Sequence, residues 1–181
     1  GGEKAFVDRL DQFFALTVEN DPDVLVDLTG SIGQYAHGNE PSHHIAYLYA
    51  YVGQQWKTAR LTRHIMKEFY RDQPDGLIGN EDCGQMSAWY ILSSLGFYPV
   101  FTASGQYVLG SPLFDKATIH LENGNSFSVE AIDNSAENIY IQSVELNGKR
   151  CDSSFISHEE IMQGGILRIR MGNKPNDDFG N

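Results

Sequence analysis

The sequence predicts an α+β protein in which helices fill the first half of the chain and short strands fill the second. Two observations predict this division. Large apolar residues recur at helical spacing up to about residue 95, and from about residue 100 they alternate with polar residues in short runs. We therefore expect one part over residues 1–99 and a β-rich part over residues 100–181. The 181 residues are 41% hydrophobic, which is enough apolar material for a core.

The first two predicted helices flank a glycine-containing loop. A helix is expected over residues 3–16, because four apolar residues recur on one of its faces: Phe6, Leu10, Phe13 and Phe14. The turn signal Asp21-Pro22-Asp23 ends this pattern. The next helix is expected over residues 41–53, since Pro41 suits a first helical position, where no N–H partner is needed.

Two further helices complete the helical half. Apolar residues at helical spacing predict a third helix over residues 56–69, which the turn Pro74-Asp75-Gly76 follows. A fourth helix is expected over residues 84–95, with Gly96 as its C-terminal cap. All of these helices carry large aromatic faces, yet four helices form only part of a helical barrel.

The second half contains six short runs that predict strands, at residues 106–109, 117–121, 127–131, 139–141, 144–146 and 166–171. Asn147-Gly148 directly follows the fifth run and is a strong hairpin signal, because both residues accept the positive φ angles of a tight turn. Short strands at this spacing predict a small antiparallel β-sandwich.

Charge and composition exclude several classes of partner. Lys plus Arg is 13 and Asp plus Glu is 24, so the net charge is 13 − 24 = −11. This argues against a nucleic-acid partner and fits a neutral substrate or a bound cation. No window is long and apolar enough for membrane insertion. Cys83 and Cys151 have no zinc-type spacing, and the sequence leaves open whether they form a disulfide.

The first polar motif is an acidic stretch, Gly79-Asn80-Glu81-Asp82-Cys83-Gly84-Gln85-Met86-Ser87, in which a glycine-bounded loop opens the fourth predicted helix. A helix N-terminus presents free N–H groups and a positive partial charge, which favour ionised carboxylates. Two carboxylates and an amide there fit a sugar-hydrolysing site. The alternative is ordinary helix capping by Asp82 or Ser87. Trp89 and Tyr90 in the following helix fit sugar stacking or, more commonly, packing in a core.

The second polar motif places Asn39 and Glu40 before the second predicted helix. His43 and His44 are adjacent, so they point to different faces and cannot both bind one metal well. Calcium accepts carboxylate, amide and carbonyl oxygens, so it suits Asn39 and Glu40 better than zinc does. The alternative is a capped helix with one histidine in the core and one at the surface. If the two helices are neighbours, both motifs form one site, and an inverting glycosidase needs paired carboxylates roughly 6.5–9.5 Å apart.

Both motifs resemble glycoside hydrolase family 92. The first stretch that carries the resemblance is His37-Gly38-Asn39-Glu40-Pro41-Ser42-His43-His44, and the second is Gly79-Asn80-Glu81-Asp82-Cys83-Gly84-Gln85-Met86-Ser87. The similarity continues through Gly96-Phe97-Tyr98-Pro99 and Gly110-Ser111-Pro112-Leu113-Phe114 to Met171-Gly172-Asn173-Lys174-Pro175-Asn176, and so covers nearly the whole chain.

The resemblance implies a calcium-dependent, exo-acting and inverting α-mannosidase of the kind that bacteria export to the periplasm or the medium. Members of the family combine an N-terminal β-sandwich with a larger (α/α)₆ barrel. The chain would then hold the last barrel helices and the C-terminal strands. The N-terminal part of the same enzyme, with the general acid, would lie upstream. The substrate would be terminal mannose of a glycan, with an α-1,2 linkage expected.

The resemblance also implies roles for individual residues. By motif position Asp82 would be the general base, with Glu81 as a second catalytic candidate. Ca²⁺ would be held by Asn39, Glu40 and Asp82, and the sugar would contact Asn39, Glu40 and Asn80. Asn80 stands where some members are expected to carry Asp.

Two other hypotheses for the function of the chain are consistent with the sequence. The chain could be a non-catalytic carbohydrate-binding or structural module, which the β-rich half and the absent general acid both allow. It could also belong to another (α/α)-barrel enzyme that acts on polysaccharides, such as a lyase. The charge of −11 argues against the acidic substrates that lyases cleave.

Overall fold

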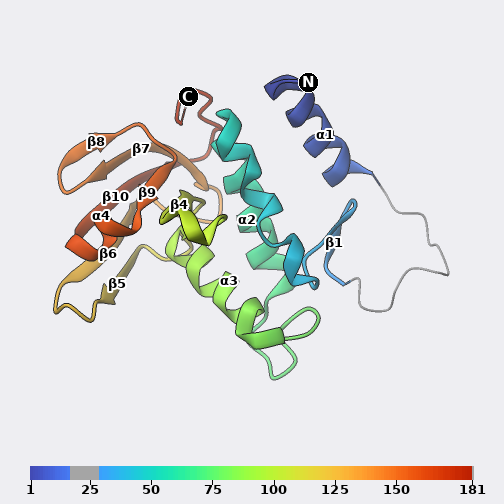
Figure 1. Ribbon diagram of the computed structural model, residues 1–181, viewed down its shortest axis with the longest axis horizontal. Helices are drawn as coiled ribbons and strands as arrows, with labels where there is room; N and C mark the ends of the chain where they lie inside the picture. The colour runs from blue at the N-terminus through green and yellow to red at the C-terminus, as the bar shows by residue number, and fades with distance from the viewer. Residues whose placement is uncertain (17–28, 181) are drawn as a thin grey trace.

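The computed structural model describes residues 1–16 and 29–180 and is an α+β protein, with the long helices on one side and most of the strands on the other (Figure 1). The break predicted at residues 21–23 lies outside the described residues. The division between residues 99 and 100 stays a prediction. The short strand β3 (Phe97–Tyr98) on one side of it pairs with β4 (Gln106–Leu109) on the other.

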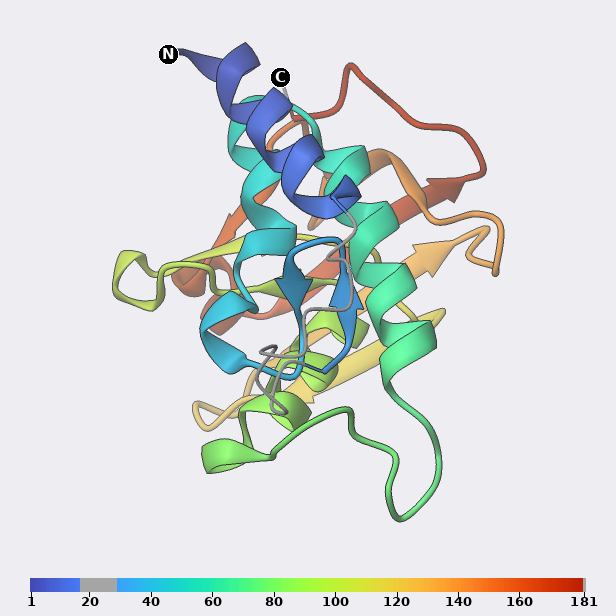
Figure 2. The ribbon, with the colours of Figure 1, turned by 90° about the vertical axis from the view of Figure 1, so that its right-hand side faces the viewer.

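Three of the four predicted helices form within one residue of their expected bounds. They are α1 (Glu3–Ala15), α2 (Gln55–Phe69) and α3 (Gln85–Leu95). Gly96 caps α3 at φ 100°, and its N–H donates to the carbonyls of Leu92 and Ser93, so the predicted C-terminal cap is confirmed. Figure 2 shows α1 crossing beside α2 at one end of the molecule, with the loop that leads into α3 at the other.

The helix predicted over residues 41–53 is not an α-helix, so this prediction is wrong in the type of helix. The chain forms two 3₁₀ segments instead, η1 (Glu40–Ser42) and η2 (Ile45–Val52). Tyr47 and Tyr49 of η2 are both buried, so side chains pack on more than one side of the segment, and apolar spacing alone does not distinguish a 3₁₀ segment from an α-helix. Gly53 ends the segment at φ 67°, as the prediction had it.

In the part of the chain that the structure describes, the strands form three sheets. A two-stranded hairpin pairs β1 (Ser31–Ile32) with β2 (Tyr35–Ala36), and a three-stranded sheet has the order β3-β4-β9, where β9 is Phe155–Ser157. The five-stranded sheet has the order β5-β6-β10-β7-β8. Its strands are β5 (Lys116–His120), β6 (Ser126–Ile132), β10 (Gly165–Gly172), β7 (Tyr140–Leu146) and β8 (Lys149–Cys151). Two 3₁₀ turns and one short helix complete the described part of the fold: η3 (Asp82–Gly84), η4 (Thr102–Ser104) and α4 (His158–Gln163).

The large sheet is mixed, so the expectation of a purely antiparallel region is wrong. β10 pairs antiparallel with β7 but parallel with β6, from Gly165 opposite Phe127 to Arg170 opposite Ile132. Between β6 and β10 the chain passes through β7, β8, β9 and α4 and returns to the same end of the sheet, as a parallel pair requires. The two runs predicted at 139–141 and 144–146 are one strand, β7. The hairpin at Asn147-Gly148 is confirmed, with φ angles of 52° and 76°.

Buried apolar side chains of the described residues form two clusters. The first lies among the helices and surrounds Trp89, and the second lies between the two larger sheets. The small sheet contributes Phe97, Leu109 and Ile156 to the second cluster, so both sheets cover one core. The helical half therefore rests on a sheet layer that fixes the C-terminal end of α3, while the N-terminal end of α3 carries the acidic motif.

Candidate functional site

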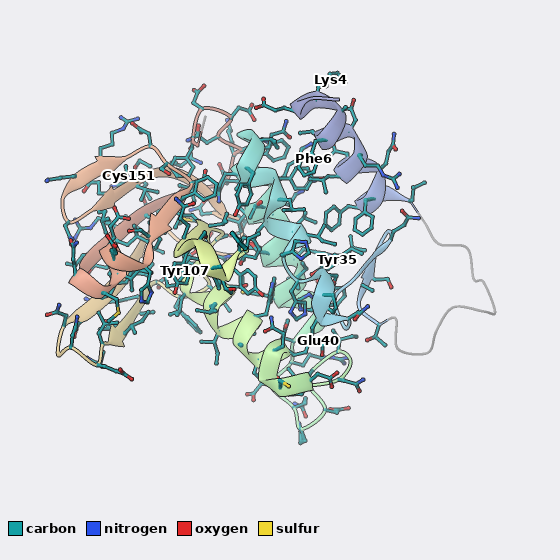
Figure 3. All side chains as sticks on the ribbon, in the orientation of Figure 1. Lys4, Phe6, Tyr35, Glu40, Tyr107 and Cys151 are labelled. Atoms are coloured by element: carbon teal, nitrogen blue, oxygen red, sulfur yellow. The ribbon has the colours of Figure 1, made fainter. Side chains whose placement is uncertain are left out.

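The two polar motifs lie against each other. We call residues 37–44 the histidine loop and residues 79–84 the acidic loop. A Cβ atom on Gly79, at φ 97°, would lie 2.9 Å from the Gly38 Cα and 3.0 Å from the Gly38 carbonyl oxygen. The two backbones therefore touch at Gly38 and Gly79, and a side chain at position 79 would prevent this contact. Figure 3 shows Glu40 at the end of the helical half where α3 begins, as the sequence prediction of one shared end requires.

A hydrogen-bonded bridge joins the histidine loop to the start of α3. The Gln85 side-chain amide Nε2 lies 3.1 Å from Nδ1 of His43 and donates to the Tyr98 hydroxyl at 3.0 Å. The other ring nitrogen of His43, Nε2, lies 2.9 Å from the carbonyl oxygen of His37 and must donate to it. His43 is therefore a neutral ring with its proton on Nε2, and its Nδ1 accepts from Gln85.

His37 is fully buried beneath this bridge. Its Nδ1 lies 2.7 Å from the Tyr35 hydroxyl and its Nε2 lies 2.7 Å from the Tyr70 hydroxyl. The Tyr70 hydroxyl donates to the Met86 carbonyl at 3.0 Å, so it accepts from His37 Nε2–H. Burial, with a smaller contribution from His43, lowers the pKa of His37 to about 3. Burial also lowers the pKa of His43.

Glu81 caps α3. The Ser87 backbone N–H donates to Glu81 Oε1 at 3.1 Å, and the Ser87 hydroxyl donates to Oε2 at 2.7 Å. The capping alternative considered for Asp82 is therefore met by Glu81 instead, and Ser87 is the donor. A carboxylate at this end of a helix also complements the helix dipole.

Among the described residues, the Asp82 side chain has no such partner. Its backbone carbonyl accepts from the Gln85 N–H, and Cys83 beside it has φ 54°. The Asp82 side chain is exposed and makes no hydrogen bond or ion pair with the described residues. The same holds for the exposed side chain of Asn80, which directly follows Gly79.

Asn39 and Glu40 directly follow Gly38, where the loops touch. The Asn39 carbonyl accepts from the Ser42 N–H at 3.0 Å and from its hydroxyl at 2.7 Å, while its exposed amide side chain has no partner in the described part of the chain. Glu40 is half-buried, and its Oε1 is buried with no hydrogen-bond partner among the described residues. A buried polar oxygen without a partner costs free energy, so a hydrogen-bond donor or a cation at Glu40 Oε1 would stabilise the protein.

The donor set is compatible with calcium. Asn39, Glu40 and Asp82 offer the hard oxygens that Ca²⁺ prefers, and a cation would pair the buried Glu40 Oε1. Within residues 1–16 and 29–180, no three His, Cys, Asp or Glu side chains converge as a closed metal site would need. A calcium ion here would therefore need amide, backbone or water oxygens to complete its coordination.

The remaining sequence candidates have structural roles. Trp89 is fully buried, and its Nε1–H donates to the His43 carbonyl at 3.1 Å, so it packs in the core. His43 is buried and His44 is exposed, as the capped-helix alternative expected. Cys83 and Cys151 are both free and do not form a disulfide.

Sequence reasoning missed the polar network of Gln85, His37, Tyr35 and Tyr70. Gln85 lies within the acidic motif, but its spacing carries no sign of its partners. Tyr35 and Tyr70 lie outside both motifs, in β2 and directly after α2. Tyr35 lies two residues before His37, but Tyr70 lies 33 residues after it and reaches the same ring only through the fold, so no local pattern could have found the network.

Residues 1–173 match the glycosyl hydrolase family 92 catalytic domain. The chain belongs to this family. A curated relative from Arthroderma benhamiae, described as an uncharacterized secreted glycosidase, is 30% identical to the family 92 chain over 177 residues. That match covers 89% of this chain and 22% of the relative.

Solved structures agree with the family 92 assignment. An α-mannosidase of Bacteroides thetaiotaomicron in complex with mannoimidazole shares 42% identity at a TM-score of 0.94, over 98% of this chain and 23% of that one. An inverting mannosidase of the same organism shares 40% identity at a TM-score of 0.84, over 99% of this chain and 26% of that one. The family 92 chain thus spans about a quarter of the length of these relatives. None of the helices in its described part is long and apolar enough to cross a membrane.

Proposed function

We propose that this chain is the C-terminal part of a longer exo-acting α-mannosidase that removes terminal mannose from glycans. The observation that carries the proposal is the contact of Gly38 with Gly79, because it joins the loop of Asn39 and Glu40 to the loop of Asp82. The match to family 92 over residues 1–173 and the two similar mannosidases support it. The general acid is proposed to lie in the upstream part of the enzyme, together with the first helices of an (α/α)₆ barrel.

Asp82 is the proposed general base of an inverting reaction. In this reaction one carboxylate takes a proton from the attacking water while a second carboxylic acid protonates the leaving oxygen. Both oxygens of Glu81 accept from Ser87, whereas the Asp82 carboxylate has no partner among the described residues and is open to water. Asp82 would therefore hold the water and accept its proton, and Glu81 would hold the first turn of α3.

Asn39, Glu40 and Asp82 are proposed to hold Ca²⁺, and Asn39, Glu40 and Asn80 to contact the sugar. When bound, the ion would orient the sugar hydroxyls and act as a Lewis acid. Asn80 would add an amide that both donates to and accepts from a hydroxyl. The buried, unpaired Oε1 of Glu40 supports this assignment, because a cation would satisfy it.

The test uses the full-length enzyme on α-mannosides, with Asp82→Asn beside Asp72→Asn, which changes an exposed Asp outside both loops. Loss of the base is expected to lower kcat about 100- to 10,000-fold, while Asp72→Asn keeps wild-type turnover. NMR of the first product should show β-mannose, the inverted anomer. Near-normal turnover by Asp82→Asn would reject the base assignment, and a wild-type enzyme without α-mannosidase activity would reject the function.

We further propose an α-1,2 linkage preference and an exported enzyme, periplasmic or extracellular. The export proposal is supported by the relative described as a secreted glycosidase. Rates on α-1,2-, α-1,3- and α-1,6-linked mannobiose test the linkage, and fractionation of the source cells tests the location. Faster cleavage of another linkage would overturn the first, and an enzyme confined to the cytosol would overturn the second.

A further inference from the structure

The position of the Asp82 carboxylate depends on its backbone, since the side chain has no partner among the described residues. That backbone is unusual. Gly79, Cys83 and Gly84 have φ angles of 97°, 54° and 74°, so the acidic loop turns through the left-handed region at both ends. The Glu81–Ser87 contact ties the loop to α3 only. The Gly38–Gly79 approach and the Trp89 bond to the His43 carbonyl hold parts of this unit to the histidine loop, but the first turn of α3 needs a connection of its own.

Gln85 makes that connection. Within the described residues, its bond to His43 Nδ1 is the one side-chain hydrogen bond between the first turn of α3 and the histidine loop. The second hydrogen on the same Nε2 goes to the Tyr98 hydroxyl on β3. Tyr98 is itself held by stacking on Tyr47, with ring centroids 5.1 Å apart. Gln85 therefore ties three elements together at one atom.

The chemistry of this bridge requires a donor at position 85. The carbonyl oxygen of His37 can only accept, so His43 Nε2 carries the ring proton and Nδ1 carries a lone pair. An amide –NH₂ satisfies both Nδ1 and the Tyr98 hydroxyl, whereas a carboxylate would place an acceptor against an acceptor. Glutamate is thus not an equivalent of glutamine here, although the two have the same shape.

We propose that Gln85 is a positioning residue that acts through His43 and holds the acidic loop against the histidine loop in the arrangement needed for turnover. The catalytic part of this inference rests on the proposed function. Gln85 does not itself react. Its loss displaces Asp82 relative to Asn39 and Glu40, and a displacement of about 1 Å in such a site lowers the rate by about 100-fold.

The first test replaces the bridge from the Gln85 side in the full-length enzyme. Gln85→Met and Gln85→Glu both remove the donor and keep the length of the side chain. We expect each to lower kcat about 10- to 100-fold while KM changes less than about threefold. Gln163→Met, on the exposed end of α4, is the matched control and is expected to keep wild-type kcat. A folded Gln85→Met enzyme with kcat within about twofold of wild type would overturn the proposal.

The second test separates the two bonds of His43. The Asn side chain reaches the position of Nδ1, so His43→Asn can still accept from Gln85. The Gln side chain reaches the position of Nε2, so His43→Gln keeps the bond to His37 and loses the bridge. Positioning through Gln85 predicts that His43→Asn retains more activity than His43→Gln, and that adding Gln85→Met to His43→Gln causes little further loss. Equal loss in the two His43 variants would overturn the proposal, since a purely structural histidine predicts no such order.

Hydrogen exchange provides a readout that needs no activity. In the Gln85→Met enzyme, amides of the histidine loop are expected to exchange faster, and in His43→Gln, amides of the acidic loop are expected to do so. Unchanged exchange in both loops would reject the bridge even if wild-type turnover proves absent. Absent turnover with the expected exchange would reject the proposed function and leave the bridge standing.

Discussion

The imidazole rings of His37 and His43 stack with their centroids 4.5 Å apart and their planes at 25°. Both rings are buried, and the indole of Trp89 lies edge-on to His37 at 4.5 Å. A protonated ring would face a second ring that has no charge to pair with it. The stacked arrangement therefore favours the neutral form of both histidines, and burial lowers the pKa of each.

This stack predicts acid sensitivity. His37 has a pKa near 6.5 when unfolded and about 3 when folded, so between these values the unfolded state binds a proton that the folded state does not. The free energy of unfolding then falls as the pH falls from 6.5 towards 3, by about 1.4 kcal/mol per pH unit, or about 3 kcal/mol at pH 4.5.

Melting temperatures of the full-length enzyme between pH 7 and 4.5 check this expectation. His37→Gln keeps polar groups near Tyr35 and Tyr70 but does not titrate, so its melting temperature should fall less than that of wild type. His44→Gln changes the exposed neighbour of His43 and should follow wild type. The same fall in all three proteins would contradict the assignment to His37.

Arg63 predicts a stability effect at the junction of helices and strands. From α2, its guanidinium donates to the Ser111 hydroxyl at 3.0 Å and the Ser135 carbonyl at 3.3 Å, and also to the Pro112 carbonyl and Asn134 Oδ1. Burial lowers its pKa to about 10, so it stays charged at neutral pH. Arg63→Met would leave these acceptors unpaired and is expected to destabilise the enzyme by about 3 kcal/mol.

Arg60→Met, one turn earlier on α2, is the control for Arg63→Met. Arg60 is exposed, and its guanidinium carbon lies over the Trp56 ring at 5.6 Å, an interaction that contributes about 0.5–1 kcal/mol. Thermal unfolding should therefore rank wild type above Arg60→Met and Arg60→Met well above Arg63→Met. Equal melting temperatures for the two variants would show that Arg63 does not join the two halves.

The sequence could predict those features that depend on local spacing. The helices α1, α2 and α3, the cap at Gly96 and the hairpin at Asn147-Gly148 all follow from residues a few positions apart. The parallel pairing of β10 with β6 could not be predicted, because residues 165 and 127 meet only through tertiary structure. The 3₁₀ winding of η2 could not be predicted either, because the apolar spacing of residues 45–52 is equally consistent with an α-helix.

The candidate site was predictable at the level of loops and not of contacts. The composition of both motifs indicated a shared polar end, and the Gly38–Gly79 contact agrees with that expectation. The different contacts of Glu81 and Asp82 could not be predicted, because the two residues are neighbours of the same chemical type. Only the geometry of Ser87 distinguishes the carboxylate that caps α3 from the one that has no partner among the described residues. The roles of these residues in metal binding and catalysis stay predictions.

Glu81 offers a test of capping against catalysis. Glu81→Gln keeps an oxygen that can accept from the Ser87 N–H, whereas Glu81→Ala removes both contacts. A capping role predicts near-wild-type turnover for Glu81→Gln, and a loss of about 1 kcal/mol in stability for Glu81→Ala. Kinetics and thermal unfolding of both variants distinguish the roles. If Glu81→Gln loses turnover as severely as Asp82→Asn, Glu81 takes part in catalysis directly.

Calcium dependence can be tested through Glu40. Chelation is expected to abolish turnover of the full-length enzyme, and added Ca²⁺ should restore it. Glu40→Gln removes a charge from the proposed donor set, so restoration should need at least about tenfold more Ca²⁺ than in wild type. Calorimetric titration with Ca²⁺ gives the affinity without any substrate. An unchanged affinity in Glu40→Gln would remove Glu40 from the metal site.

The contact between the two loops predicts that Gly79 tolerates no side chain. Gly79→Ala would suffer both the strain of φ 97° and a Cβ atom 2.9 Å from the Gly38 Cα. Gly124→Ala is the matched control, because φ is 86° there but nothing lies within 4 Å of the new Cβ. Backbone strain alone costs about 1–3 kcal/mol, so Gly124→Ala should lower stability by that amount and leave kcat unchanged.

Gly79→Ala should have the same strain and also push the acidic loop away from the histidine loop. Turnover should therefore fall in Gly79→Ala by more than its loss of stability explains, by about 100-fold if the loops separate by about 1 Å. Initial rates well below the melting temperature of each variant make the comparison. Equal kcat in the two alanine variants would mean that the close approach of Gly38 and Gly79 matters for packing alone, and that Asp82 does not depend on the histidine loop for its position.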